Sequence, residues 1–395
     1  MADEKIIVKN FGPIRDVELD LCKVTVLIGE QASGKSVLAK LIAKFEDYNE
    51  IRPGFNAFDY YNLDSCIENG SEVIYDNNLY QIEYKYTNGE PDKIKKKFKN
   101  HIFQNEIDEL QKAQENFFLS EHKYDKATNE SDRDELRLQK EFWGNKLDSQ
   151  FKKLSKIISE IIYIPTERLL VSILSESDEI RKSIAPKFQF VYKFYSEYWA
   201  YRKSNDPLHI DFLNLKFQHH NYQDEIELKN NKIINLSDSS NGIQSIIPML
   251  VVLNGKAKSR NKKVFIIEEP ELNLYPTTQK KLVEYLIEKC TKGDNRLIIT
   301  THSPYILTAL NNLIQAKNVA KNRPELADEV GQIVPPQYHL DFEDIAAYFV
   351  ADGMARSIMN VENQLIDANA LDDVSNDLSE EFGKLVQLEF QDLAI

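Results

Sequence analysis

The chain has little cysteine, no excess of positive charge and no long apolar run. Its three cysteines, Cys22, Cys66 and Cys290, are far apart among 395 residues and lack the paired spacing of disulfides or zinc sites. No run approaches the roughly 18 apolar residues of a membrane span. The first residues, Met-Ala-Asp-Glu-Lys, lead directly into a strand interrupted by polar residues. We therefore expect a soluble, cytoplasmic protein with no signal peptide and no membrane contact.

The net charge of −14 excludes a surface that is basic all over, although a local basic groove stays possible. Basic residues gather in two runs, at 93–99 and 256–263. Such runs are more often solvated faces than binding sites, so contact with nucleic acid is the less favoured alternative. The length suits one large α/β domain with an insertion, or two domains.

Proline is absent and glycine is rare between residues 101 and 159, where Glu, Lys, Gln, Leu and Phe dominate. This composition predicts two charged helices, broken near residues 128–132, that form an antiparallel hairpin inserted into the main domain. Two interpretations stay open for the hairpin. It is either a helical layer on the body of the protein or an arm with a function of its own.

A phosphate-binding loop is predicted at residues 29–36, which read Gly-Glu-Gln-Ala-Ser-Gly-Lys-Ser and fit the pattern G-x-x-x-x-G-K-[ST]. A buried strand at 23–28 precedes the loop and a helix with an apolar face at 37–43 follows it. Glycines let the backbone N–H groups curl around phosphate oxygens, while Lys35 reaches the β- and γ-phosphates and Ser36 binds Mg²⁺. The residues expected to bind the nucleotide here are Gly29, Ala32, Ser33, Gly34, Lys35 and Ser36.

Acidic and polar residues follow two further buried strands. The run Val264-Phe265-Ile266-Ile267 is followed by Glu268 and Glu269. We expect Glu268 to bind Mg²⁺ and Glu269 to act as general base toward water. The run 297–301 is followed by His302. We expect this histidine to lie where it can sense a γ-phosphate. A satisfied structural histidine is the alternative at that position.

A turn of small residues at 239–245 opens an apolar helix at 246–253. The start of such a helix is a second site suited to anions, with Ser240 as cap and donor.

These motifs, taken in order, resemble a known family. The phosphate loop, an S-S-x-G turn, F-I-I-E-E-P-E and T-T-H-S-P are similar to the ABC-type ATPase heads of the SMC, RecF and OLD group. More narrowly, they resemble the bacterial ATPases of anti-phage defence systems whose heads carry E-E-P-E and T-H-S-P. Residues 9–14 and 163–168 also look like that subgroup. The resemblance spans residues 5–45 and 160–310.

The resemblance implies a role for each motif. Gly29, Gly34, Lys35 and Ser36 would form Walker A, Glu268 would be the Walker B acid, Glu269 the catalytic glutamate and His302 the switch histidine. Ser240 and Gly242 would belong to the signature motif, which in this family completes the ATP site of the opposite protomer.

The sequence departs from the family at Asn241 and Ile243, where the signature usually has glycine and a glutamine or glutamate. A Q-loop glutamine has no firm position, Gln104 being one candidate.

The predicted fold is therefore an α/β P-loop NTPase of the ABC-ATPase type with a helical-hairpin insertion. The expected parts are 1–100 and 161–334 for the two portions of the head, 101–160 for the hairpin and 335–395 for a C-terminal cap or docking region. ATP and Mg²⁺ are the expected cofactors. Asp372-Asp373 lies in a polar stretch and reads as solvated surface, so we expect any nuclease activity to come from a partner.

Three functions are compatible with this sequence. The favoured one is an ATPase switch for a separately encoded nuclease or toxin in anti-phage defence, which forms a homodimer or a higher homo-oligomer through contact between its heads. A repair or chromosome-maintenance ATPase is the alternative. The nucleotide-binding subunit of a transporter is the least favoured, because transporter heads lack such a helical insertion and use a more glycine-rich signature.

Overall fold

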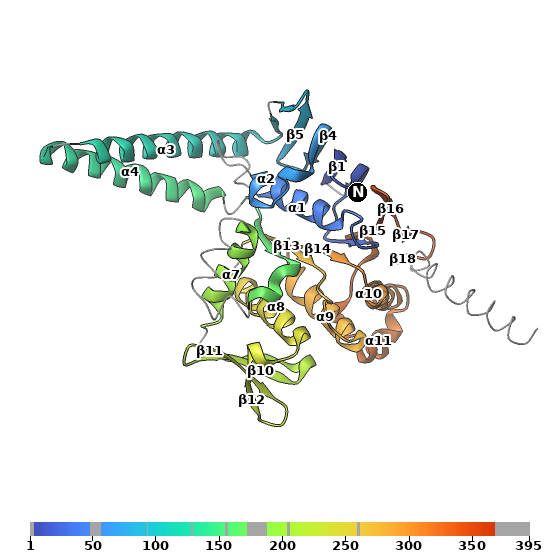
Figure 1. The fold of residues 1–395 in the computed structure, drawn as a ribbon. Helices are drawn as coiled ribbons and strands as arrows, with labels where there is room; N and C mark the ends of the chain where they lie inside the picture. The colour runs from blue at the N-terminus through green and yellow to red at the C-terminus, as the bar shows by residue number, and fades with distance from the viewer. Residues whose placement is uncertain are drawn as a thin grey trace, which may run out of the picture.

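The computed structural model describes residues 4–47, 57–92, 94–127, 129–154, 157–171, 188–203, 206–258 and 261–367. Within these residues, twelve strands assemble into one large sheet (Figure 1). Its main path runs β6-β5-β4-β1-β2-β16-β15-β3-β14-β13-β8, with β7 attached to β5.

The half of the sheet that carries the predicted motifs is parallel. β15, β3, β14, β13 and β8 lie in that order, each parallel to the next. Their bounds are Ile345–Ala351, Val24–Ile28, Arg296–Thr301, Lys263–Glu268 and Glu160–Ile164. Every residue of β3, β13 and β14 is buried, which fits parallel strands covered on both faces.

Successive residues of these strands point to opposite faces of the sheet and pack into two different hydrophobic cores. In β13, Phe265 and Ile267 pack into the core with helices α7–α10, while Val264 and Ile266 pack into the core with α1. The helices are α1 (Lys35–Glu46), α7 (Gln189–Tyr201), α8 (Asn241–Ala257), α9 (Pro276–Cys290) and α10 (Pro304–Asn322). Two shorter helices are α2 (Ala57–Tyr60) and α11 (Ala327–Ile333).

The other half of the sheet is largely antiparallel. Its strands are β1 (Lys5–Phe11), β2 (Ile14–Asp20), β4 (Ile67–Asp76), β5 (Tyr80–Thr87), β6 (Glu90–Pro91) and β7 (Lys95–Phe98). Asn88 and Gly89 form the turn that joins β5 to β6, and both residues have positive φ, as an Asn-Gly pair favours.

The predicted helical hairpin is confirmed as α3 (His101–Lys126) and α4 (Glu130–Leu154), which project together from the head (Figure 1). Lys140 pairs with Glu121 and Lys153 with Glu106 across the two helices. The base of α3 belongs to the head, because Phe103 and other residues of its first turns are buried in the core that holds α1. The hairpin is thus an arm that projects from the head and whose base is packed into the head.

The C-terminal part differs from the predicted cap at 335–395. β15 lies inside the central sheet, next to β3, and β16 (Met354–Ser357) joins β15 to β2. Residues 345–357 are therefore part of the head, because β15 supplies the strand that covers the edge of β3. β17 (Met359–Asn360) and β18 (Leu365–Ile366) form a small separate ladder. Residues 368–395, including Asp372-Asp373, lie outside the described residues.

A second sheet has the order β12-β11-β10-β9 and lies beside α8 (Figure 1). Its strands are β9 (Leu208–Ile210), β10 (Leu215–His220), β11 (Gln223–Leu228) and β12 (Ile233–Asn235). β11 and β12 form an antiparallel hairpin in which Glu225 lies opposite Asn235. The large central sheet, the helices that pack on it and the projecting α3–α4 hairpin confirm the predicted P-loop α/β class with a helical-hairpin insertion.

Candidate functional site

The predicted phosphate loop connects β3 to α1 and needs both of its glycines, for different reasons. A β-carbon on Gly29 would stand 2.1 Å from the carbonyl oxygen of Val350 in β15, so any side chain would collide there. Gly34 caps α1 with φ 102°, in the region that favours glycine. Between them, Ala32 also has a left-handed backbone, with φ 60°.

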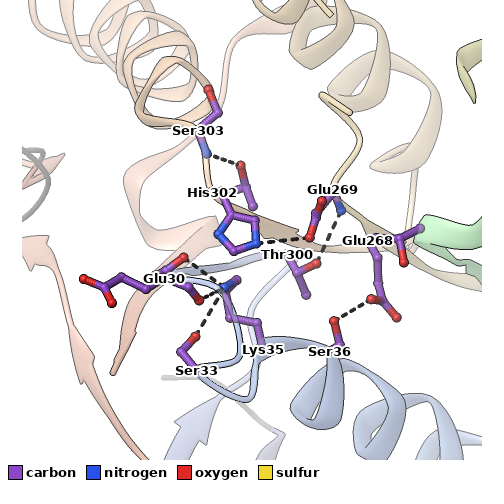
Figure 2. A network of polar contacts seen from close by, with 12 residues as sticks. Glu30, Ser33, Lys35, Ser36, Glu268, Glu269, Thr300, His302 and Ser303 are labelled. Atoms are coloured by element: carbon purple, nitrogen blue, oxygen red, sulfur yellow. Dashed lines mark hydrogen bonds and ion pairs between the residues drawn. The ribbon is translucent and has the colours of Figure 1, made fainter. Parts of the chain in front are cut away.

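Lys35 lies within this loop and is 5% exposed. Its Nζ donates hydrogen bonds to the carbonyls of Gly29 (2.9 Å) and Glu30 (2.6 Å) and to Ser33 Oγ (3.2 Å; Figure 2). Burial lowers the pKa of Lys35, while the carboxylates that surround it act in the opposite direction. The ammonium group thus stands where it can reach phosphate oxygens held by the loop.

Ser36 and Glu268 meet at the start of α1. Ser36 Oγ donates a 2.6 Å hydrogen bond to Glu268 Oε2 (Figure 2). Glu268 is 2% exposed, and its Oε1 has no hydrogen-bond partner among the described residues. Burial raises the pKa of Glu268 to about 7. A hydroxyl beside a buried carboxylate with an unpartnered oxygen fits Mg²⁺, which prefers oxygen ligands.

Glu269 follows directly and faces His302 from the neighbouring strand end. Its Oε1 lies 3.1 Å from His302 Nε2, and the two side chains are 25% and 30% exposed (Figure 2). The Glu269 amide donates to the Thr300 carbonyl of β14 at 2.8 Å. The Glu269 carboxylate is therefore in contact with a histidine and partly open to solvent, an arrangement that suits a group expected to activate water.

Glu271 is a further member of this site, one for which the motifs predict no role. It is 8% exposed, and its Oε1 accepts hydrogen bonds from Thr301 Oγ1 (2.5 Å) and from the His302 amide (3.0 Å). Burial raises the pKa of Glu271. Glu271 thereby ties the segment after β13 to the end of β14, where His302 stands. Its place in E-E-P-E was the available signal.

The predicted signature turn lies against a different part of the chain. Ser240 caps α8 through its carbonyl, whereas its exposed side chain makes no capping hydrogen bond. Gly242 is buried, and a β-carbon there would stand 2.5 Å from the Asn273 carbonyl oxygen. Gln244 Nε2 donates to the carbonyls of Ser237 (2.9 Å) and Ser239 (2.8 Å), so the turn is also tied to the residues that precede it.

The second basic run is not a continuous basic face. Lys256 is 8% exposed and pairs with Glu160 (2.6 Å) and Glu197 (3.0 Å), while Lys263 is fully buried. Arg260 lies outside the described residues.

Gln104, the Q-loop candidate, lies in the first turn of α3 at the base of the arm.

Several solved structures are similar to this chain at low identity. The SMC head domain of Pyrococcus furiosus, with an extended coiled coil and bound to the C-terminal domain of ScpA, has 11% identity and a TM-score of 0.37 over 94% of this chain and 98% of that one. The SMC head domain of Thermotoga maritima has 12% identity and a TM-score of 0.37 over 91% and 98%. The recombination mediator RecF has 12% identity and a TM-score of 0.36 over 90% and 97%. Likeness at this level says nothing about activity.

No curated protein matches the chain. None of the helices in the described residues has both the length and the hydrophobicity of a membrane span. Residues 24–308 match the family described as "AAA domain, putative AbiEii toxin, Type IV TA system". This match includes the phosphate loop, the acidic strand end and His302. The protein therefore belongs to this family of AAA domains.

Proposed function

We propose that the chain binds ATP with Mg²⁺ and hydrolyses it. The observation that carries this proposal is the contact of Ser36 with Glu268, since it joins the phosphate loop to the acidic strand end. Lys35 would hold the β- and γ-phosphates, and Ser36 and Glu268 would hold Mg²⁺, which would neutralise phosphate charge.

The remaining two side chains would carry the chemistry. Glu269 would accept a proton from the attacking water as that water approaches the γ-phosphate. His302 would orient the Glu269 carboxylate through the 3.1 Å contact between them and would stand beside the γ-phosphate.

The test is hydrolysis of MgATP by the wild type, Glu269→Gln and Glu18→Gln. Glu269→Gln should bind ATP with unchanged affinity and hydrolyse it roughly 100- to 10,000-fold more slowly, because only the proton acceptor is lost. Glu18→Gln, which alters an exposed carboxylate of β2, should match the wild type. Normal turnover by Glu269→Gln would place the base elsewhere, and a wild type without hydrolysis would contradict the proposed activity.

The active form would be a head-to-head dimer of ABC-type heads, resembling the SMC, RecF and OLD group. The exposed Ser240, whose side chain makes no capping hydrogen bond, and the start of α8 offer an anion site that a second copy could present to the bound triphosphate. Gly242 would bring this turn close to the phosphates. Two-fold symmetry then generates two identical sites.

The biological role we propose is a cytoplasmic switch for a separately encoded effector, a nuclease or toxin, in anti-phage defence. The family description, which names a toxin and a toxin–antitoxin system, supports this direction. Phage plating on cells that carry this gene with its neighbours, as wild type or Lys35→Ala, tests the role. Equal plating would contradict it, as would an adjacent permease gene in place of an effector.

The alternative is a repair or chromosome-maintenance ATPase that contacts nucleic acid. The 26 residues of α3 correspond to a length of about 39 Å, which is short for tethering distant segments of DNA. The defence role is therefore favoured.

A further inference from the structure

Arg168 lies behind the turn that carries Glu269. It belongs to a short 3-10 helix, Thr166–Leu169, directly after β8, and β8 is paired with β13. Its side chain is fully buried, with 0% exposure. A buried guanidinium is costly unless its donors are satisfied, so its partners indicate what it stabilises.

Those partners are backbone carbonyls of the acidic strand end. Nη1 donates to the carbonyl of Glu268 at 2.6 Å and to that of Pro165 at 3.0 Å, while Nη2 donates to the carbonyl of Glu269 at 2.5 Å. One planar guanidinium thus binds the carbonyls of two successive residues, which a single ammonium could not do with the same geometry. Arg168 does not use a carboxylate oxygen for these bonds, so both carboxylates stay available.

The turn that Arg168 binds has a backbone conformation that is unfavourable for residues other than glycine. Glu269 has φ 43°, in the left-handed region. On the other side, the Glu269 amide donates to the Thr300 carbonyl. The residue is therefore held through its amide by β14 and through its carbonyl by Arg168.

This backbone conformation decides where the carboxylate of Glu269 points. Its contact with His302 is 3.1 Å long, and a change in φ at Glu269 would swing the whole side chain away from His302. Misplacement of a reacting group by about 1 Å can lower a rate by roughly 100-fold.

We infer that Arg168 is a positioning residue for ATP hydrolysis, which keeps Glu269 in its left-handed backbone and so aims its carboxylate at the attacking water. This inference rests on the proposed role of Glu269 as general base. Arg168 itself touches neither the water nor the nucleotide in this scheme.

The experiment compares Arg168→Lys and Arg168→Gln with the wild type in ATP affinity, single-turnover hydrolysis at saturating MgATP and thermal unfolding. We expect ATP affinity to stay within about threefold and the rate of hydrolysis to fall at least about 10-fold in Arg168→Lys, and further in Arg168→Gln. Affinity and rate should respond differently because the phosphate loop does not depend on Arg168, whereas the orientation of the Glu269 carboxylate does.

Lys263→Met is the matched control. Lys263 is also a fully buried cation, at the opposite end of the same strand β13, where its Nζ donates to the Asn261 carbonyl at 2.6 Å. Its loss should lower the melting temperature while the rate at saturating ATP stays within about twofold of the wild type. The control therefore separates general destabilisation of β13 from misplacement of Glu269.

Two outcomes would overturn the inference. One is a wild-type rate in Arg168→Lys and Arg168→Gln. The other is failure of both variants to fold while Lys263→Met folds, since Arg168 would then be a structural residue. Glu269→Gln is measured alongside, because normal turnover in that variant would refute the proposed base rather than the role of Arg168.

Discussion

The carbonyl oxygen of Asn273 lies 2.5 Å from the position that a β-carbon on Gly242 would take. Glycine at 242 is therefore required by packing within one chain, whatever a second copy contributes. Gly242→Ala should lower the free energy of unfolding by about 1–3 kcal/mol, because the added methyl group forces the two backbones apart. Ser240→Ala should leave stability unchanged, since that side chain makes no capping bond. Denaturant unfolding of both variants tests the contrast, and equal stabilities would contradict it.

A shared active site should reveal itself by complementation. We choose Ser240→Glu because Ser240 is exposed and a carboxylate there would face the γ-phosphate of the partner. Lys35→Ala and Ser240→Glu should each be inactive. After mixing and exchange, half of the dimers hold one intact site, so about a quarter of wild-type ATPase activity should return.

Coupling between the two sites could hide this recovery. Sedimentation of Glu269→Gln with and without ATP is the companion measurement, because slow hydrolysis should trap the dimer. Neither recovery nor ATP-dependent association would leave a P-loop ATPase that works without a head-to-head partner.

ATP binding should depend on Lys35. Lys35→Ala removes the buried ammonium that the Gly29 and Glu30 carbonyls hold inside the loop, so affinity for ATP should fall at least about 10-fold and hydrolysis should be lost. Titration with a fluorescent ATP analogue measures the effect. Lys9→Ala, at an exposed position of β1, is the control and should bind normally. Equal affinity in Lys35→Ala would refute the assignment of the loop.

The pH dependence of stability should report the buried Glu268. Its pKa is raised by burial from 4.5 to about 7, so the folded protein binds this proton more tightly than the unfolded chain does. The resulting stability is present below the unfolded pKa and is lost as the pH rises through the folded pKa. Glu268→Gln cannot ionise, so without nucleotide and Mg²⁺ its stability relative to the wild type should grow by roughly 2 kcal/mol between about pH 5.5 and about pH 8. A difference that does not change with pH would contradict the raised pKa.

The arm should be separable from hydrolysis only in its outer part. Phe103, Ile107 and Leu110 at the base of α3 are buried in the head, so deletion of all of 101–159 would open the core. Replacing residues 116–144 by a short Gly-Ser turn should keep basal ATPase activity, because the nucleotide residues lie elsewhere, and should abolish protection against phage. Intact protection would make the outer arm dispensable.

Much of the local structure could be predicted because its causes are local. The phosphate loop depends on a glycine pattern between a strand and a helix, and the arm depends on helical composition without proline. The apolar strands β13 and β14 were recognised from runs that end in polar residues. Parallel strands deliver such ends to one edge of the sheet, which is why the expected closeness of Ser36, Glu268, Glu269 and His302 agrees with the geometry.

The contacts between distant segments could not be predicted in the same way. β15 has an apolar sequence that would suit a cap as well as a sheet, and only its pairing with β3 explains why Gly29 tolerates no side chain. Gly242 fits a signature motif by sequence, yet packing against Asn273 also requires a glycine there.

The sequence by itself determined the chemistry available at this site, because a loop that wraps phosphate and a strand that ends in acids are each encoded within a few residues. Only the tertiary structure decided how the side chains at this site are oriented. Burial of Arg168 against the carbonyls of Glu268 and Glu269 depends on β8 pairing with β13, and Glu268 is 100 residues away from Arg168 along the chain. An arginine after a strand is otherwise a surface residue. Only packing of the whole sheet removes it from water and turns its donors toward the turn at Glu269.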